Sequence, residues 1–209
     1  MQVSQRADGL YWPDSDQHAC YAWTQAEIAS VEHILNACDH HECVIHAGAN
    51  VGAYALKFSQ AFKQVYAFEP DRCNFKCLSL NTLHVDNIYP MFAALGAHSG
   101  TIHMHNPEPA NCGTVAVSPV SHKGHIPMIQ IDHLNLQHVN CVHLDLEGYE
   151  LFALQGAQKT ISRCKPLVVV EWLNHGANYG YTLQEVQSLL YDWGYTHMKA
   201  VGSDMMFKA

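Results

Sequence analysis

Apolar residues along this 209-residue chain change repeatedly from continuous runs to helical spacing and back. Short apolar runs bounded by turn residues are typical of buried strands, whereas apolar residues at every third or fourth position predict amphipathic helices. The predicted strands cover residues 43–47, 64–68, 88–95, 101–105, 128–131, 139–145, 166–172, 195–200 and 204–208. The predicted helices cover residues 25–38, 53–62, 71–83, 149–163 and 182–193.

Two short motifs predict where helices begin. Thr24-Gln-Ala-Glu27 and Thr182-Leu-Gln-Glu185 both have the capping-box pattern, in which a threonine and a later glutamate satisfy backbone N–H groups reciprocally. We therefore expect Thr24 to cap the first of these helices and Thr182 to cap the last.

Strands that alternate with helices predict a parallel sheet with helices on both faces. The last two strands are separated by Gly202 and Ser203, which favours an antiparallel hairpin at one edge. The predicted fold class is therefore α/β, a Rossmann-like sandwich with a mostly parallel sheet and an antiparallel C-terminal hairpin. The length fits one domain, placed at residues 24–209, with residues 1–23 as an N-terminal extension.

The composition excludes several classes of protein. Hydrophobic residues make up 48% of the chain and charged residues 14%, so the chain is not disordered as a whole. No apolar run approaches the ~18 residues of a membrane span, and the N-terminal residues lack the apolar core of a signal peptide. A cytoplasmic location is therefore expected, with the eight cysteines reduced.

The formal net charge of −8 disfavours nucleic acid and anionic membranes as partners, because both require basic patches. About a quarter of the 16 histidines carry a proton at neutral pH, which brings the net charge to roughly −4. The conclusion holds, because lysine and arginine form no cluster longer than two residues. The sequence gives no indication of the oligomeric state.

The turn Gly48-Ala-Asn-Val-Gly52 joins the first buried strand to the following helix. Glycine allows close approach to the backbone, and the start of a helix carries partial positive charge. The spacing is neither the dinucleotide fingerprint Gly-x-Gly-x-x-Gly nor a phosphate-binding loop, and it suits a ligand without pyrophosphate. The alternative is an ordinary turn between strand and helix, with Asn50 as the helix cap.

Glu69 lies 21 residues after Gly48, at the end of the next predicted strand. In nucleotide-binding sheets an acid at this place accepts hydrogen bonds from the hydroxyls of a ribose. The alternative is a solvated glutamate at a strand end. Glycine turn and acid together favour a nucleoside ligand.

Four motifs in order resemble the FkbM family of S-adenosylmethionine-dependent methyltransferases. They are His46-Ala-Gly-Ala-Asn-Val-Gly52, Phe68-Glu-Pro70, Ile131-Asp-His-Leu134, and Leu144-Asp-Leu-Glu-Gly-Tyr-Glu150 followed by Leu154-Gln-Gly-Ala157. The strand Pro166-Leu-Val-Val-Val-Glu171 also fits, so the resemblance covers about residues 42–175. It implies the class I methyltransferase fold, S-adenosylmethionine as cofactor, and O-methylation of a hydroxyl on a sugar, glycan or small metabolite.

The resemblance also implies where the cofactor binds. The implied cofactor-binding residues are His46, Gly48, Ala49, Asn50, Gly52, Glu69, Pro70, Asn74 and Asp145. The family usually carries aspartate at the position of His46, where the acid helps to hold the amino-acid end of the cofactor. Histidine hydrogen-bonds but carries no fixed negative charge, so this departure can make cofactor affinity depend on pH.

Asp145 and Glu147 follow the predicted strand 139–145, and strand carboxyl ends face the ligand crevice in such sheets. Two carboxylates two residues apart point the same way while the chain is extended. The resemblance implies that Asp145 contacts the methionine end of the cofactor or the acceptor, and that Glu147 orients or deprotonates an acceptor hydroxyl. Glu171 and His175, after the next strand, are further catalytic candidates. The alternative is that the acids only favour the start of a helix.

Residues 106–126 are irregular and rich in proline and glycine, and loops of this length are usually functional or mobile. The chain leaves little room for a separate substrate domain. We therefore expect residues 1–23 and 106–126 to shape the acceptor pocket.

Histidine and cysteine pairs such as Cys141-x-His143 lack the Cys-x-x-Cys arrangement of structural zinc sites. We therefore expect no metal site, although magnesium aided by Asp145 stays open. Two other functions also stay open. One is a non-catalytic module that binds a nucleoside ligand or a protein, which His46 favours, and the other is a nicotinamide-dependent oxidoreductase, which the missing Gly-x-Gly-x-x-Gly disfavours.

Overall fold

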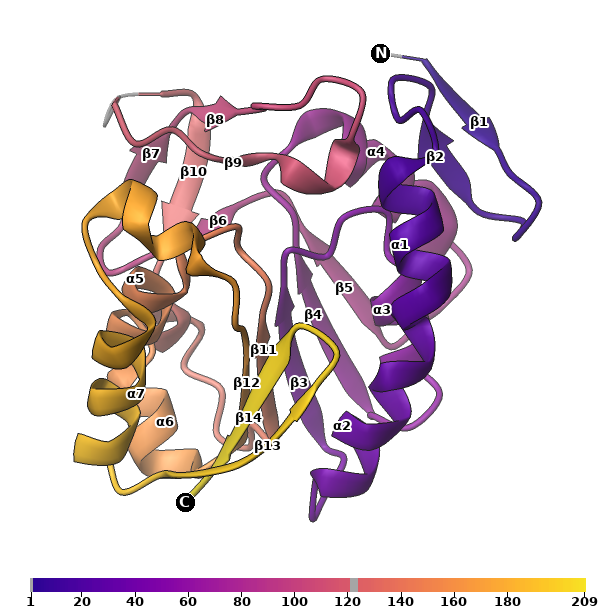
Figure 1. Ribbon diagram of the computed structural model, residues 1–209. Coiled ribbons are helices and arrows are strands. Elements are labelled where there is room, and N and C mark those ends of the chain that lie inside the picture. The colour runs from indigo at the N-terminus through magenta and orange to yellow at the C-terminus, as the bar shows by residue number, and fades with distance from the viewer. Residues whose placement is uncertain (1, 121–123) are drawn as a thin grey trace.

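The computed structural model describes residues 2–120 and 124–209 (Figure 1). Its central sheet has the strand order β13-β14-β12-β11-β3-β4-β5. These strands are β3 Cys43–Ala47, β4 Gln64–Phe68, β5 Ile88–Met91, β11 Cys141–Leu144, β12 Leu167–Glu171, β13 Thr196–Val201 and β14 Asp204–Lys208. The strands from β12 to β5 are parallel, whereas β14 is antiparallel to β12 and forms a hairpin with β13. The predicted α/β class, mostly parallel with an antiparallel C-terminal hairpin, is confirmed.

Helices cover both faces of this sheet (Figure 1). One face carries α1 Ala19–Glu27, the 3-10 turn Ile28–Ser30, α2 Val31–Ala37, α3 Ala53–Phe58 and α4 Arg72–Thr82, and the other carries α5 Glu150–Gln155, α6 Gln158–Cys164 and α7 Leu183–Asp192. Alternate residues of a strand point to opposite faces. In β3, Val44 belongs to the same hydrophobic cluster as Phe58 of α3. Its neighbour Ile45 belongs to the opposite cluster, with Leu154 of α5.

The predicted start of the first helix, with Thr24 as its cap, is wrong. Helix α1 begins at Ala19, so Thr24 lies inside it. Asp16 accounts for the earlier start, because its carboxylate accepts the backbone N–H groups of Cys20 at 3.1 Å and Tyr21 at 3.3 Å. This side chain supplies the capping that the local pattern assigned to threonine.

The capping box at the start of α7 is confirmed. The Glu185 carboxylate accepts the backbone N–H of Thr182 at 2.8 Å, and the threonine side chain caps the helix in return. This pattern succeeds because both partners lie within one helical turn.

The predicted helix over residues 149–163 is two helices, α5 and α6, which meet near Gly156. Asp132 helps to begin α6, because its carboxylate accepts the backbone N–H of Thr160 at 2.8 Å. Gly156 also packs on the backbone of Gly96, where a Cβ on residue 156 would lie 2.1 Å from the carbonyl oxygen. Contacts with distant segments therefore divide a pattern that is locally continuous.

Two predicted strands are also divided, because their halves pair in different sheets. The short elements involved are β6 Ala94–Leu95, β7 Gly100–Ile102, β8 Met104–His105, β9 Ala116–Val117 and β10 Ile126–Ile129. The predicted strand 88–95 becomes β5 and β6, and 101–105 becomes β7 and β8. Strands β6 and β7 pair with β10, while β8 pairs with β9. The segment 106–126 thus contains β9 and the 3-10 turn Cys112–Thr114, and its residues 121–123 lie outside the described residues.

The N-terminal residues form a hairpin, β1 Val3–Gln5 and β2 Tyr11–Pro13, beside α4 (Figure 1). Asn81 of α4 holds the hairpin in place. Its amide oxygen accepts the N–H of Tyr11 at 2.7 Å, and its amide nitrogen donates to the carbonyl of Val51 at 2.8 Å. The hairpin is therefore tied to the glycine turn. Residue 23, predicted as the last of the extension, lies within α1.

All eight cysteines lie in the described residues, and none forms a disulfide. Cys43 and Cys77 are buried in the hydrophobic interior, where burial raises the pKa of both thiols to about 12. These thiols behave as small hydrophobic side chains. Over residues 2–120 and 124–209, no helix combines the length and hydropathy that a bilayer span requires.

Candidate active site

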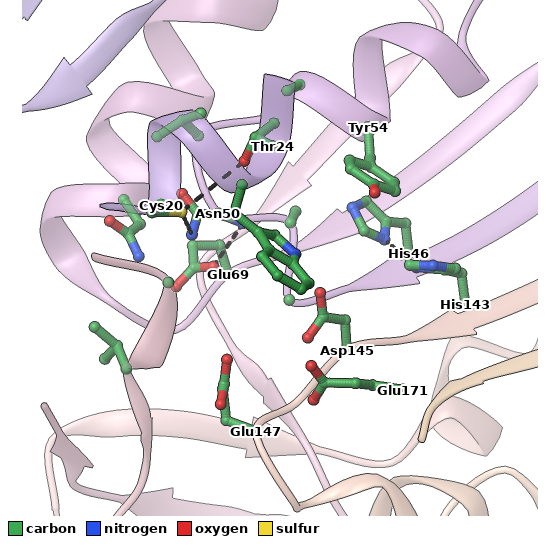
Figure 2. A pocket seen from close by; sticks show the side chains of 18 of the residues that line it. Cys20, Thr24, His46, Asn50, Tyr54, Glu69, His143, Asp145, Glu147 and Glu171 are labelled. Carbon is green, nitrogen blue, oxygen red and sulfur yellow. Dashed lines mark hydrogen bonds between the residues drawn. The ribbon is translucent and has the colours of Figure 1, made fainter. Parts of the chain in front are cut away.

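The carboxyl ends of β3, β4, β11 and β12 border an open cavity of about 860 Å³, which we call the first cavity (Figure 2). Most of the predicted site residues line it, namely His46, Gly48, Ala49, Asn50, Glu69, Asn74, Asp145, Glu147 and Glu171. Helix α1 adds Cys20, Trp23 and Thr24 to the wall.

Three predicted site residues lie outside the first cavity. Pro70 lines an adjoining hollow of about 400 Å³. His175 lines a second open cavity of about 840 Å³, and Glu147 lines both the first and the second cavity. Residues between 105 and 119 form much of the wall of this second cavity, which also includes Tyr179. Gly52 lines none of the three.

The two glycines of the turn are required by the chain itself. Gly48 has φ 80°, and a Cβ there would lie 1.7 Å from the carbonyl oxygen of Asp145. Gly52 has φ 93°, and a Cβ there would lie 2.8 Å from Cδ1 of Leu78 in α4. The positive φ and the close packing both demand glycine, whether or not a ligand approaches.

Asn50 and Asn74 connect the rim of the first cavity to the 3-10 turn Cys112–Thr114. The Asn74 amide donates to the carbonyl of Cys112 at 2.9 Å, and the Asn50 amide donates to the same carbonyl at 3.4 Å. Asn50 does not cap α3, which starts after Gly52 without a side-chain cap. The Oδ1 atom of Asn74 is buried and has no hydrogen-bond partner among the described residues. An unsatisfied buried acceptor costs ~1–3 kcal/mol, so this atom is suited to a ligand donor.

Glu69 connects the glycine turn to the start of α4. One carboxylate oxygen accepts the N–H of Asn50 and the other accepts the N–H of Asp71, both at 2.8 Å. Each oxygen keeps a second lone pair, so the carboxylate can still accept hydrogen bonds from two hydroxyls. Burial raises the pKa of Glu69 to about 8, although the two N–H donors oppose this effect.

Asp145, Glu147 and Glu171 form an acidic wall on the opposite side of the cavity (Figure 2). Burial raises the pKa of each, and the neighbouring carboxylates add to the effect. The pKa rises to about 8 for Asp145, about 7 for Glu147 and about 11 for Glu171. No lysine or arginine in the described part of the chain lines this cavity, so a cationic ligand would relieve the crowding.

The geometry of the acidic turn differs from the expected extended chain. Glu147 has φ 53°, in the left-handed region that non-glycine residues rarely adopt. The buried Glu150 carboxylate holds this turn by accepting the N–H groups of Leu146 at 2.8 Å and Gly148 at 3.1 Å. Asp145 and Glu147 both reach the cavity because of this turn, and the alternation of an extended chain is not the reason.

His46 and His143 face each other on the neighbouring strands β3 and β11. Their Nδ1 atoms are 2.9 Å apart, and Figure 2 shows the two rings side by side. Nε2 of His143 is 3.4 Å from Oδ2 of Asp204. Burial, followed by the nearby His143, lowers the pKa of His46 well below its usual value. The sequence prediction missed His143 and Asp204 as site residues. The available signal was that His46 and His143 both lie near the carboxyl ends of predicted buried strands.

His175 contacts two members of the acidic wall. Its Nδ1 atom is 3.0 Å from Oε2 of Glu147 and 3.8 Å from Oε2 of Glu171. These three side chains offer ligand atoms that all lie within 4.8 Å of one another and could hold a divalent cation. The expected place for magnesium was beside Asp145, which is not part of this group. Nδ1 of His175 is buried and makes no hydrogen bond within the described residues.

The parallel sheet carries a glycine turn, a buried acid after the next strand and further acids beyond β11, and all of them surround one cavity. This arrangement is the architecture of class I methyltransferases. A sequence model of the FkbM methyltransferase domain matches residues 46–196, which is more than half of the chain. The chain therefore belongs to the FkbM methyltransferase family.

Solved structures agree on the fold. Methyltransferase FkbM from Methylobacillus flagellatus KT is 18% identical with a TM-score of 0.55, over 81% of this chain and 44% of that one. This chain thus spans less than half the length of that protein. A SAM dependent methyltransferase from Aquifex aeolicus is 14% identical with a TM-score of 0.50, over 88% of this chain and 90% of that one. Both share the Rossmann-like methyltransferase fold with this chain. No curated protein matches the sequence.

Proposed function

We propose that this chain binds S-adenosylmethionine in the first cavity and transfers its methyl group to a hydroxyl of a sugar, a glycan or another small metabolite. The observation that carries the proposal is that Glu69 and the acidic wall line the same cavity. No lysine or arginine among the described residues lines that cavity. A ligand with a sulfonium and an ammonium fits these acids, because its positive charge favours their ionised form, whereas a pyrophosphate disfavours that form.

The residues of the first cavity divide between the two ends of the proposed cofactor. The lone pairs that remain on Glu69 suit the ribose hydroxyls, and the unpaired Oδ1 of Asn74 suits a further donor of the nucleoside. The turn Gly48–Gly52 and the hollow at Pro70 border the same end. The amino-acid end then lies toward His46 and Asp145.

Glu147 is the proposed base. The cofactor supplies a methyl group already activated by the sulfonium, so the main task of the chain is to position the acceptor. A hydroxyl acceptor must also lose a proton, which passes to the Glu147 carboxylate as the oxygen attacks the methyl group. Glu147 lies between the two cavities, and its pKa of about 7 suits a base at neutral pH. Nδ1 of His175 lies 3.0 Å from this carboxylate.

Glu171 has a different proposed role. Its side chain is 9% exposed, and its pKa of about 11 keeps it protonated at neutral pH. A protonated carboxyl donates a hydrogen bond and does not act as a base. Glu171 therefore holds either Asp145 or a bound acceptor in place.

The second cavity is the proposed acceptor site, because it meets the first at Glu147. His105, Glu108 and Asn178 give it hydrogen-bonding side chains that suit a polyhydroxylated acceptor. The net charge of −8 supports such a small acceptor over nucleic acid. The free thiols support a reducing, cytoplasmic location.

A non-catalytic binding module is the second candidate, favoured by a buried histidine where the family usually has an acid. Titration calorimetry with S-adenosylmethionine and with NAD distinguishes both candidates, the methyltransferase and the binding module, from an NAD-dependent oxidoreductase. We expect binding of S-adenosylmethionine only. Transfer of a labelled methyl group to a panel of sugars and glycans then separates enzyme from module. Failure to bind S-adenosylmethionine would sink the proposal.

A further inference from the structure

The side chains of His46, His143 and Asp204 form a continuous polar chain inside the protein, and Figure 2 labels the two histidines. The two histidines are 2% and 1% exposed, and Asp204 is 7% exposed. Asp204 is the first residue of β14 and lies beyond the segment 46–196 that matches the FkbM domain model. The C-terminal hairpin therefore brings a carboxylate to the histidine at the cofactor site.

The contacts restrict where the protons can lie. Two imidazole nitrogens 2.9 Å apart must share one proton, so one Nδ1 donates and the other accepts. An N–H on Nε2 of His143 can donate to the Asp204 carboxylate, 3.4 Å away. With that N–H in place, a neutral His143 has no second N–H, so its Nδ1 is an acceptor. Nδ1 of His46 is then the donor, and Nε2 of His46 keeps a lone pair.

This lone pair is available to the first cavity. His46 lines that cavity, and the edge of its ring away from His143 faces it (Figure 2). Within the described residues, Nε2 of His46 makes no hydrogen bond. Tyr54 stacks on the imidazole at 5.9 Å and Phe58 packs edge-on at 5.5 Å, which fixes the ring plane. The cavity thus contains a rigid neutral acceptor.

We propose that His143 and Asp204 are positioning residues that hold His46 as the Nδ1–H tautomer, so that its Nε2 accepts a hydrogen bond from the ammonium of the cofactor. This deepens the proposed function and rests on it for the identity of the ligand. The negative charge that a carboxylate at position 46 would place at the ammonium is placed at Asp204, which His143 connects to His46 and which also lines the first cavity. Hydrogen-bonded chains polarise one another, so the charge of Asp204 makes Nε2 a stronger acceptor.

A double-mutant cycle tests this arrangement by titration of the full chain with S-adenosylmethionine. We expect Asp204→Asn to weaken binding by roughly tenfold or more, the scale of a hydrogen bond to a charged group. His46→Asp puts a carboxylate at the ligand itself. In that background Asp204→Asn should change affinity by less than about twofold. The reason is that the polar chain of His143 and Asp204 no longer determines which atom of residue 46 accepts from the ligand. Asp192→Asn, which removes an exposed acid at the end of α7, is the matched control and should bind normally.

An equal loss from Asp204→Asn in both backgrounds would mean that Asp204 acts directly on the ligand or on the fold and not through His46, which would overturn the proposal. So would no loss in the parent chain. A second readout does not depend on the cofactor: long-range ¹⁵N NMR of the histidine rings in the resting protein. We expect the Nδ1–H tautomer at His46 and the Nε2–H tautomer at His143, and the opposite assignment would overturn the relay. If the parent chain bound no S-adenosylmethionine while NMR gave these tautomers, the cofactor assignment would fail and the relay would stand.

Discussion

Gly48 lies directly against the backbone of Asp145, so that a Cβ on residue 48 would be 1.7 Å from the Asp145 carbonyl oxygen. The glycine turn after β3 and the acidic turn after β11 are therefore built on each other. The same contact sets the distance between the proposed ribose site at Glu69 and the acidic wall. A turn expected to approach a ligand thus first approaches its own chain.

The first prediction concerns this contact. Gly48→Ala should destabilise the fold by at least ~2 kcal/mol, because the new Cβ meets backbone and the left-handed φ of 80° adds strain. Urea unfolding measures the loss. Gly9→Ala is the matched control, since Gly9 has φ 83° but nothing within 4 Å of its Cβ position. Equal losses at the two glycines would mean that strain alone, and not the Asp145 contact, determines the cost.

The second prediction concerns Glu69. Glu69→Ala should weaken binding of S-adenosylmethionine by ~1.5–3 kcal/mol, the scale of hydrogen bonds to a charged group. Titration calorimetry checks it. Asp71→Asn serves as the control, because Asp71 caps α4 but does not line the first cavity. It should lower thermal stability and leave affinity unchanged. Normal affinity in a folded Glu69→Ala chain would remove the ribose assignment.

The third prediction concerns the pH dependence of transfer. Burial raises the pKa of Glu147 to about 7, so the carboxylate that accepts the proton becomes populated as pH rises through 7. The transfer rate should therefore increase from pH 5 to pH 8. Glu147→Gln should bind cofactor normally, lose ~10²–10⁴-fold in rate and lose this pH limb. Glu108→Gln, in the same second cavity, should keep the limb. A Glu147→Gln chain as fast as the parent contradicts the role as base.

The fourth prediction separates Asp145 from Glu147. Asp145 lines the first cavity and the hollow at Pro70, but not the second cavity. Asp145→Asn should therefore raise the dissociation constant of S-adenosylmethionine first, whereas Glu147→Gln should affect rate first. Parallel titration and transfer assays measure both. If both variants bind and turn over like the parent, catalysis must be assigned to Glu171 and His175.

The fifth prediction concerns stability and pH at Glu171. Burial and the neighbouring acids raise its pKa from 4.5 to about 11, so the folded chain keeps a proton that the unfolded chain has lost above pH 4.5. This contribution is fully present below pH 4.5 and disappears as pH rises toward 11. Glu171→Gln needs no proton, so its melting temperature should exceed that of the parent at pH 8 and match it near pH 4. An equal shift at both values would contradict the raised pKa.

Much of the fold and part of the candidate site could be predicted from local sequence patterns. The strand at 43–47, the glycine turn and Glu69 are contiguous or evenly spaced features, and strand ends of a parallel sheet must meet at one edge. For this reason most predicted cofactor residues line one cavity. The predicted capping box at Thr182 is also confirmed, because both of its partners lie in one helical turn.

Tertiary structure decided the features that depend on distant partners. Helix α1 starts early because Asp16 binds its first N–H groups, and the pattern over 149–163 breaks where Gly156 meets Gly96. The contact of His143 with Asp204 joins residues 61 positions apart and exists only because the C-terminal hairpin pairs with β12. Hydrophobic periodicity fixes which face of an element is buried. Register and side-chain reach between elements fix which polar atoms meet, and no local pattern encodes them.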